Sequence, residues 1–173
     1  MCQPTRTVRS PLPEDIRAEA REDFRALLRE RNLPATPQRM AIYDVLLETN
    51  DHICAEHILD KARARHPGRR MNKTTVYRTL DILLSLGLVY EMKRDDGRAQ
   101  YEHTLRGPHG HLICRRCERI EDLDLTVAAM VQASINRRYG FQVDLVGHAL
   151  PGLCSRCRDA VQTLLKDGSF ISG

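Results

Sequence analysis

Two Cys-x-x-Cys pairs, Cys114/Cys117 and Cys154/Cys157, constrain the second half of this chain more than any other feature. Zinc takes four tetrahedral ligands, and one Cys-x-x-Cys turn can direct two thiolates at a single ion. Two such turns complete the coordination and leave no open position. The pattern therefore predicts a structural zinc site that ties the end of a domain to its beginning. A redox dithiol is the alternative, but a thioredoxin-like site would have a single pair after a strand and before a helix.

The remaining composition suits a soluble, cytosolic protein. Hydrophobic residues make up 42% of the chain, and no stretch approaches the roughly 20 apolar residues that cross a bilayer. Residues 1–13 are polar and basic, without the apolar segment of a secretory signal. We therefore expect a cytosolic protein with no membrane partner. In a reducing compartment, paired cysteines favour metal binding over a disulfide.

The first half of the chain contains four segments in which apolar residues recur at helical spacing. These segments predict helices over residues 14–31, 36–49, 51–65 and 74–87. Residues that can cap a helix N-terminus precede the last three helices: Thr36 before Pro37, Asp51, and either Thr74 or Thr75.

After Gly87 the pattern changes to alternation, over residues 88–93 and again over 98–102, with Asp95-Asp96-Gly97 between them. This is a β-hairpin signal. Short helices followed by a basic-tipped hairpin indicate a winged-helix domain, in which the last helix before the hairpin enters the major groove of DNA. The net charge of +4 is unevenly spread, which suits a polyanion, although solvated helix faces are the alternative. The clustered basic residues are Arg69, Arg70, Lys73, Arg78, Lys93, Arg94 and Arg98.

Residues 105–110 are rich in glycine, proline and histidine, and we interpret them as a hinge. The chain then divides into a winged-helix domain with an N-terminal helix, residues 1–104, and a second domain, residues 111–173. The second domain is expected to contain strands over 111–114, 120–123 and 141–145, a helix with an apolar stripe from Val127 to Ile135 that ends at Gly140, and a short helix over 155–165.

The predicted fold class is α+β, a winged helix-turn-helix domain followed by a small α/β dimerisation domain with a structural zinc site. Short strands and a helix bury little apolar surface on their own, so a domain of this kind needs further sources of stability. The metal site and a second copy of the chain are the two sources that we expect.

A second group of metal-ligand side chains surrounds the hinge. In an extended segment alternate residues point to the same side, so His109 and His111 can share one ion. Glu102 stands at the end of the predicted hairpin beside them, and His52 lies earlier in the chain. Imidazole and carboxylate ligands together suit Fe, Mn, Zn, Ni or Co. Such a site would bridge the two predicted domains and set their relative angle, whereas surface or helix-capping roles are the alternative for any single histidine.

Four motifs follow one another in order along the chain: Thr36-Pro37-Gln38-Arg39, Thr75-Val76-Tyr77-Arg78-Thr79-Leu80, His109-Gly110-His111-Leu112-Ile113-Cys114-Arg115-Arg116-Cys117 and Gly152-Leu153-Cys154-Ser155-Arg156-Cys157. Together they resemble the ferric uptake regulator family over about residues 33–158. The resemblance implies a homodimeric transcriptional repressor that binds palindromic operators in double-stranded DNA when it is metallated.

The resemblance also implies roles for individual residues. The four paired cysteines would hold zinc, and Fe(II), Mn(II) or Zn(II) would act as corepressor at the family's hinge site. The implied ligands of that regulatory metal are His52, Glu102, His109, His111 and, as the fifth, Asp122. Tyr77 and Arg78 would contact DNA from the recognition helix. With the neighbouring motif and basic residues, the expected DNA-binding set is Arg39, Lys73, Thr75, Tyr77 and Arg78.

The sensed signal stays open, because Asp122 resembles the peroxide-responsive branch of the family and Glu102 the iron-responsive branch. A peroxide sensor that acts by metal-catalysed histidine oxidation is therefore the rival within the family. From other classes, a metallohydrolase could use an open His/Glu site, and a zinc-ribbon adaptor could lack DNA binding. A hydrolase needs no winged helix, and the chain has no nucleophile elbow, phosphate-binding glycine loop or His-Glu-x-x-His motif. We therefore expect a regulator of metal homeostasis or oxidative-stress genes and not an enzyme.

Overall fold

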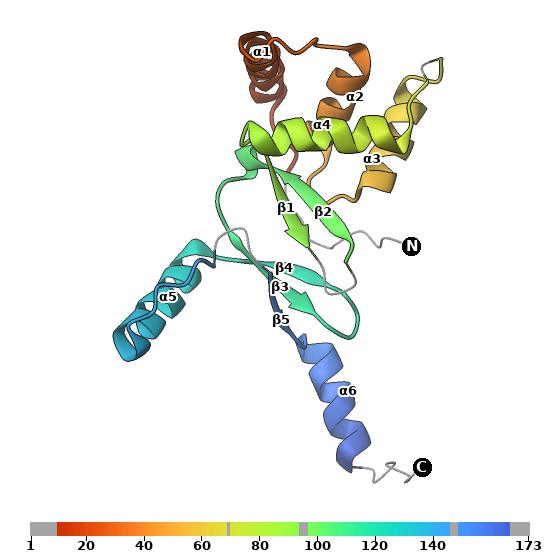
Figure 1. Ribbon diagram of the computed structural model, residues 1–173. Helices are drawn as coiled ribbons and strands as arrows, with labels where there is room; N and C mark the ends of the chain where they lie inside the picture. The colour runs from red at the N-terminus through yellow and green to blue at the C-terminus, as the bar shows by residue number, and fades with distance from the viewer. Residues whose placement is uncertain (1–9, 69, 94–96, 146–148, 167–173) are drawn as a thin grey trace. The chain divides into compact units, whose positions relative to one another are not determined.

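The computed structural model describes residues 10–68, 70–93, 97–145 and 149–166, and for Lys93 and residues 161–166 it describes the backbone alone. The chain divides into two compact units, Met1–Gly107 and Pro108–Gly173, which we call the head and the base (Figure 1). The boundary between them falls inside residues 105–110, the segment interpreted as a hinge. Residues singled out above that lie outside the described part are Arg69, Arg94, Asp95 and Asp96.

The head contains the four predicted helices followed by a two-stranded hairpin (Figure 1). The helices are α1 (Glu14–Glu30), α2 (Pro37–Glu48), α3 (Ala55–Arg65) and α4 (Lys73–Ser85). The hairpin pairs β1 (Val89–Lys93) with β2 (Ala99–His103) in antiparallel register, and a short 3-10 helix, η1 (Thr104–Arg106), follows. This order of helices and hairpin is that of a winged helix-turn-helix domain.

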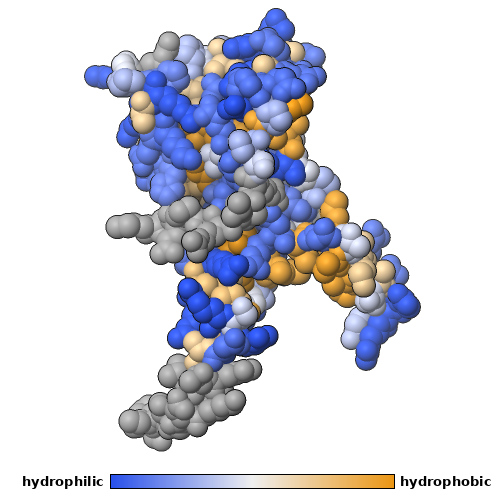
Figure 2. Space-filling model, turned by 180° about the vertical axis from the view of Figure 1, so that it is seen from behind, coloured by the Kyte–Doolittle hydropathy of each residue, from blue (hydrophilic) through white to orange (hydrophobic). Residues whose placement is uncertain are grey.

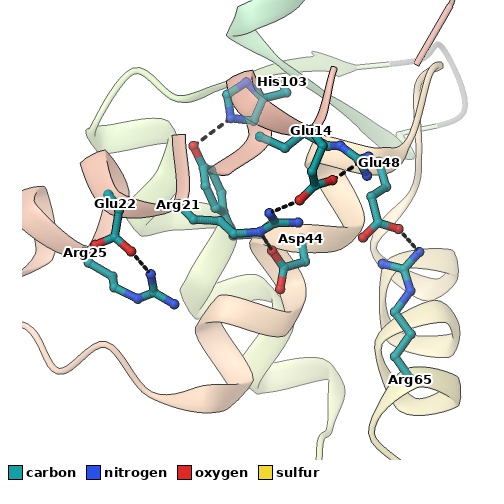
Figure 3. A network of polar contacts seen from close by, with 10 residues as sticks. Glu14, Arg21, Glu22, Arg25, Asp44, Glu48, Arg65 and His103 are labelled. Carbon is teal, nitrogen blue, oxygen red and sulfur yellow. Dashed lines mark hydrogen bonds and ion pairs between the residues drawn. The ribbon is translucent and has the colours of Figure 1, made fainter. Parts of the chain in front are cut away.

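Helix α2 forms the centre of the core of the head. Its residues Ala41–Leu47 are buried except for the partly exposed Asp44, so the helix is apolar on almost every side. Phe24 of α1 packs against it, with ring centroids 4.4 Å from Tyr43. Asp44 pairs with Arg21 of α1, with Oδ1 and Nε 2.6 Å apart (Figure 3). Helix α1 is thus held to α2 by an apolar contact and by an ion pair at its edge.

One of the predicted helix caps is correct and two are wrong. The hydroxyl of Thr36 caps α2 by accepting from a backbone N–H of the first turn. Helix α3 begins after Cys54, because the carboxylate of Asp51 is engaged by the next residue and not by a helix N-terminus. Helix α4 begins at Lys73, two residues earlier than a Thr74 cap would place its start; its cap is Asn72, which accepts from the N–H of Thr75 at 2.9 Å.

The base contains a three-stranded sheet and two helices (Figure 1). Its strands are β3 (Gly110–Cys114), β4 (Ile120–Leu123) and β5 (Ala149–Gly152), and its helices are α5 (Leu125–Tyr139) and α6 (Ser155–Lys166). The strand order is β4-β3-β5, with β3 antiparallel to β4 and parallel to β5. The parallel pairing brings the end of β3 and the end of β5 to the same edge of the sheet.

The fold class is α+β, as predicted, and the base has a small core. One buried cluster joins β4, α5 and the segment before β5 through Leu123, Ala128 and Leu145. Asp124 caps α5, and Gly140 ends it with a φ of 63°, a left-handed conformation that glycine adopts without strain. No helix in the described part of the chain is both long enough and apolar enough to cross a bilayer.

The predicted strand over residues 141–145 is wrong, because this segment is not paired in the sheet. Both sides of β3 are already occupied by β4 and β5. The backbone of the segment finds a side-chain partner instead: Gln132 of α5 donates from Nε2 to the carbonyl oxygen of Val143 at 2.9 Å. Of the alternating apolar residues only Leu145 is buried, whereas Phe141 is 64% exposed, so the alternation does not mark a strand face.

Candidate metal centres and nucleic-acid surface

Two turns of the base bring the four paired cysteines together. Cys114 is the last residue of β3, and Cys117 lies in the turn that follows it. Cys154 directly precedes α6, and Cys157 lies in the first turn of that helix. Because β3 pairs in parallel with β5 as far as Cys114 and Gly152, both turns start from the same edge of the sheet.

The spacing of the four sulfur atoms fits a tetrahedral zinc ion. All four Sγ atoms lie within 4.8 Å of one another, and the Sγ atoms of Cys117 and Cys154 are 3.7 Å apart. Four sulfurs at Zn–S bonds of about 2.3 Å would be about 3.8 Å apart. None of the five cysteines in the described part of the chain forms a disulfide. The cluster therefore contains a complete ligand set for a structural zinc ion.

The thiols of this cluster differ in acidity. Burial raises the pKa of Cys114, but hydrogen bonds from backbone N–H groups, among them those of Cys154 and Cys117, favour its thiolate and bring the pKa to about 6. Desolvation, together with the three neighbouring cysteines, raises the pKa of Cys157 to about 12. The Cys114 thiol therefore ionises readily, while the Cys157 thiolate needs a nearby cation, which a bound metal ion would supply.

In the head, His52 and Glu102 form a buried pair. Ile53 exchanges two backbone hydrogen bonds with Tyr101, with N···O distances of 3.0 and 2.9 Å. Because these residues are the chain neighbours of His52 and Glu102, the bridge holds the two side chains beside each other. His52 Nε2 lies 3.6 Å from Glu102 Oε2, and the side chains are 2% and 3% exposed. The pair offers one imidazole and one carboxylate ligand to a metal such as Fe, Mn or Zn.

In the base, three ligand side chains gather at the start of β3. His111 is the register partner of Asp122 on β4, and the ring of His109 lies 4.6 Å from that of His111. His109 Nε2 is 3.6 Å from Asp122 Oδ1. Gly110 makes this arrangement possible, since a Cβ there would lie 2.5 Å from the carbonyl oxygen of Leu145. The regulatory site expected from the sequence thus has two of its residues in the head and three in the base.

His103, next to Glu102, has a structural role and is not free to bind a metal. Its Nδ1 accepts from the N–H of Leu105 at 3.0 Å, so the ring proton lies on Nε2. Nε2 donates to the hydroxyl of Tyr43 at 2.9 Å (Figure 3). Desolvation by burial, with a smaller effect of nearby Arg106, lowers the pKa of His103 to about 4.

Helix α4 has one buried and one exposed side, as a recognition helix requires. Val76 is fully buried, whereas Tyr77 is 43% exposed and Arg78 is exposed beside it. Lys73, in the first turn, is also exposed, and its Nζ lies 3.4 Å from Glu56 of α3. Lys73, Tyr77 and Arg78, three of the five residues expected to contact DNA, are therefore exposed on one helix.

The other two expected DNA contacts have local partners. Thr75 donates from its backbone N–H and its hydroxyl to Asn72 Oδ1, at 2.9 and 3.0 Å, and so belongs to the cap of α4. Arg39 lies in the first turn of α2, on a different element, where its guanidinium donates to the carbonyl oxygen of Pro34. Four of the five residues expected to contact DNA thus lie on α4, while Arg39 lies at the start of α2.

Sequence reasoning missed three residues that support these sites. The sequence pattern predicts Asp51 as a helix cap, although a carboxylate directly before a candidate ligand histidine is also a signal of a supporting role. Asn72 stands three residues before Thr75, which is the spacing of a helix cap. His103 gave no signal that could distinguish it from the ligand histidines, because its role depends on Tyr43, far away in the chain.

Comparison with known proteins agrees with this architecture. The model of the ferric uptake regulator family matches residues 30–150. The zinc uptake regulation protein of Mycobacterium tuberculosis is 37% identical over 127 residues, which cover 72% of this chain and 94% of that protein. The peroxide-responsive repressor PerR of Staphylococcus aureus is 26% identical over 146 residues, covering 84% and 96%. The structure of the Helicobacter pylori ferric uptake regulator superposes with a TM-score of 0.69 at 20% identity, covering 81% of this chain and 93% of that one.

Fold and sites together define a two-domain protein with a winged helix-turn-helix head and a small base that carries a four-cysteine cluster. The family match runs from the end of α1 to the second residue of β5 and so spans most of both domains. This chain belongs to the ferric uptake regulator family.

Proposed function

We propose that this chain is a metal-dependent DNA-binding transcriptional repressor of metal homeostasis or oxidative-stress genes. The observation that supports it best is the presence, in one head, of an exposed recognition helix and the buried His52–Glu102 pair. The names of its relatives, a zinc uptake regulation protein and a peroxide-responsive repressor, belong to the same functional class. We expect the protein to act in the cytoplasm, with access to DNA.

The regulatory metal would take its ligands from both domains. The head offers His52 and Glu102, and the base offers His109, His111 and Asp122. Neither set alone completes the coordination of Fe(II), Mn(II) or Zn(II), while together they supply five mixed nitrogen and oxygen ligands. A bound cation would supply the positive charge that joins the two sets. With residues 105–110 as the hinge between domains 1–104 and 111–173, the joined state is the one proposed to bind DNA.

The four-cysteine cluster would hold a structural zinc ion in the base. The apolar core there is small, and Cys114 and Cys154 belong to segments that are joined by the pairing of β3 with β5. Zinc ligation by all four cysteines would stabilise that pairing directly, because a closed four-thiolate site contributes folding free energy.

The recognition helix α4 would enter the major groove of DNA. Tyr77 and Arg78 are exposed on it, and Lys73 and Thr75 lie in its first turn, where the helix dipole favours phosphate. Arg39 at the start of α2 would add a backbone contact of the same kind. Two such heads in one dimer would read the two halves of a palindromic operator.

Helix α5 supports a homodimer. Its apolar stripe is exposed in the single chain: Val127 is 46%, Met130 66% and Val131 38% exposed. Figure 2 shows hydrophobic surface on this helix, at the lower right of that view. An exposed apolar helix face on a small domain is typical of a subunit interface. Met130→Lys should produce monomers in analytical ultracentrifugation, whereas Asn136→Lys, on another side of α5, should leave a dimer; a monomeric wild-type protein would contradict the dimer.

The test of metal-dependent repression is a DNA-binding titration at buffered free Mn(II), Fe(II) and Zn(II). Metal should raise the operator affinity of the wild type, and Asp122→Ala or His109→Ala should weaken that dependence while zinc content stays unchanged. Glu121→Ala is the matched control, because it removes an exposed carboxylate one residue away on β4. Equal DNA affinity of the wild type with and without metal would overturn the proposal.

A peroxide sensor is the second candidate, and it is favoured by the presence of Asp122 among the ligands of the base. The 26% identity to a peroxide-responsive repressor points the same way. Mass spectrometry of the iron-loaded protein after peroxide treatment separates the two candidates. A gain of one oxygen on His52 or His109, with loss of DNA binding, favours the peroxide sensor, whereas an unmodified protein favours a sensor of metal alone.

A further inference from the structure

The carboxylate of Asp51 contacts His52 at two points. Its Oδ1 accepts from the backbone N–H of His52 at 2.7 Å and lies 3.3 Å from the ring nitrogen Nδ1. An ionised carboxylate only accepts hydrogen bonds, so the ring contact requires the proton on Nδ1. The lone pair of the neutral ring is then on Nε2, the atom that lies 3.6 Å from Glu102 Oε2.

We propose that Asp51 is a positioning residue for the regulatory metal site, which holds His52 in the Nδ1–H tautomer and directs its Nε2 lone pair toward Glu102. This inference rests on the proposed function, since it assigns Asp51 a role at the same site. A metal-ligating histidine commonly donates its second ring N–H to a carboxylate, which fixes the tautomer and makes the ligand more basic. Asp51 stands in that relation to His52.

The loop that carries Asp51 has two anchors that do not involve its carboxylate. On one side, Arg106 Nη2 donates to the carbonyl oxygen of Thr49 and to Asn50 Oδ1, at 3.0 and 2.9 Å. On the other side, Ile53 forms its backbone bridge with Tyr101. Removal of the Asp51 carboxylate therefore takes away the acceptor for the ring N–H and for the backbone N–H of His52, while both of these anchors of the loop remain.

The neighbouring His103 shows that the head controls the tautomer of each histidine separately. There, a backbone N–H donates to Nδ1 and places the proton on Nε2. At His52 a carboxylate acceptor sits at Nδ1 and places the proton on that nitrogen. In His103, both ring nitrogens hydrogen-bond to protein groups. In His52, the unprotonated Nε2 faces the Glu102 carboxylate, which is the orientation that a metal ligand requires.

The tautomer can be measured without any regulatory metal. In ¹⁵N-labelled full-length protein loaded with structural zinc alone, long-range ¹H–¹⁵N spectra should show His52 protonated on Nδ1, with the signals assigned by comparison with His52→Gln. In Asp51→Ala the population should shift toward Nε2–H. Asp51→Asn retains an acceptor oxygen and should keep the Nδ1–H form, whereas Asp60→Ala, which removes an exposed carboxylate of α3, should change nothing.

Metal affinity gives the second measurement. In titrations with Mn(II), Asp51→Ala should bind at least tenfold more weakly than the wild type, as loss of an outer-sphere carboxylate does elsewhere. Asp51→Asn should lie between them, Asp60→Ala should match the wild type, and zinc content should be one per chain throughout. An unshifted tautomer or an unchanged Mn(II) affinity in Asp51→Ala would overturn this inference alone. A wild-type protein that binds no metal beyond structural zinc would overturn the proposed function, and the role of Asp51 with it.

Discussion

The ring of His103 and the hydroxyl of Tyr43 meet inside the head, with Nε2 and the oxygen 2.9 Å apart (Figure 3). The contact joins the end of β2 to the central helix α2, and Tyr43 in turn packs on Phe24 of α1. The strand that carries Glu102 is thereby fixed to the core by the residue directly after it. The position of the carboxylate thus depends on a buried hydrogen bond to a distant helix.

This contact predicts a pH dependence of folding stability. The pKa of His103 is lowered to about 4 in the folded protein, below the 6.5 of an exposed histidine, because burial disfavours the charged ring. The unfolded chain therefore takes up the proton first as the pH falls. The stabilising contribution is complete above pH 6.5 and declines between pH 6.5 and 4. This pH dependence is measured by urea unfolding of the metal-depleted protein at several pH values, with the unfolding of the head followed by fluorescence or circular dichroism.

His103→Asn is the variant that tests this assignment. Asparagine can still cap η1, but it loses the bond to Tyr43, so the head should be about 1–3 kcal/mol less stable at pH 7. Its stability should also fall less steeply than that of the wild type between pH 6.5 and 4. His66→Asn, at the end of α3, should retain the wild-type profile. An identical pH profile for His103→Asn and the wild type would show that His103 is not the titrating group.

The cysteine cluster predicts that the two domains respond differently to zinc removal. Cys154→Ser should abolish stoichiometric zinc and unfold the base, since the core is small and the metal would stabilise the pairing of β3 with β5. The head has its own large apolar core and should stay folded. Elemental analysis measures the zinc, and amide hydrogen exchange should show lost protection at Ile113 and Ile120 and retained protection at Leu46.

Cys54→Ala provides the matched control for the cysteine variants. Cys54 is also a buried cysteine, at 2% exposure, but it precedes α3 in the head and lies outside the cluster. This variant should therefore bind one zinc ion per chain. Full amide protection of the base in zinc-free Cys154→Ser would contradict a structural role for the metal.

Much of the secondary structure could be predicted because it follows from local patterns. The strand over Ile120–Leu123 and the helix from Glu14 match their predicted bounds to within a residue, since apolar periodicity reflects burial directly. The segment 141–145 shows the same kind of pattern without a strand. A strand also needs a neighbour with free backbone groups, and the order of the sheet cannot be obtained from the alternation of one segment.

The cysteine cluster and the His52–Glu102 pair also differ in how far they could be predicted from the sequence. Each Cys-x-x-Cys motif contains its own geometry, so the sequence points to both turns before any fold is known. The closeness of His52 to Glu102 depends instead on the bridge between Ile53 and Tyr101, which no spacing reveals. The separate tasks of His52 and His103 depend on which group reaches each Nδ1 atom, and this is a property of the fold.

The exposed side of α4 predicts that Arg78 contributes to DNA affinity without contributing to folding. Arg78→Ala should weaken operator binding by about 1–3 kcal/mol and lower the salt dependence by about one counterion if the contact is to phosphate. Arg137→Ala removes an arginine of α5 in the base that is also exposed, and it should bind DNA as the wild type does. Fluorescence anisotropy at several salt concentrations measures both quantities. Equal losses in the two variants would mean that only net charge matters.

The cap of α4 separates helix stability from DNA recognition. Asn72 Oδ1 accepts from the N–H and the hydroxyl of Thr75, so Asn72→Ala should destabilise the head by about 1 kcal/mol and weaken operator binding through fraying of the first turn. Aspartate caps as well as asparagine does, so Asn72→Asp should retain the stability of the wild type. It should nevertheless weaken DNA binding, and more strongly at low salt, because it places a carboxylate where α4 would meet phosphates. Urea unfolding and anisotropy titrations on the same samples measure the two effects. An Asn72→Asp variant that is stable and binds the operator as tightly as the wild type would place the start of α4 away from the DNA backbone.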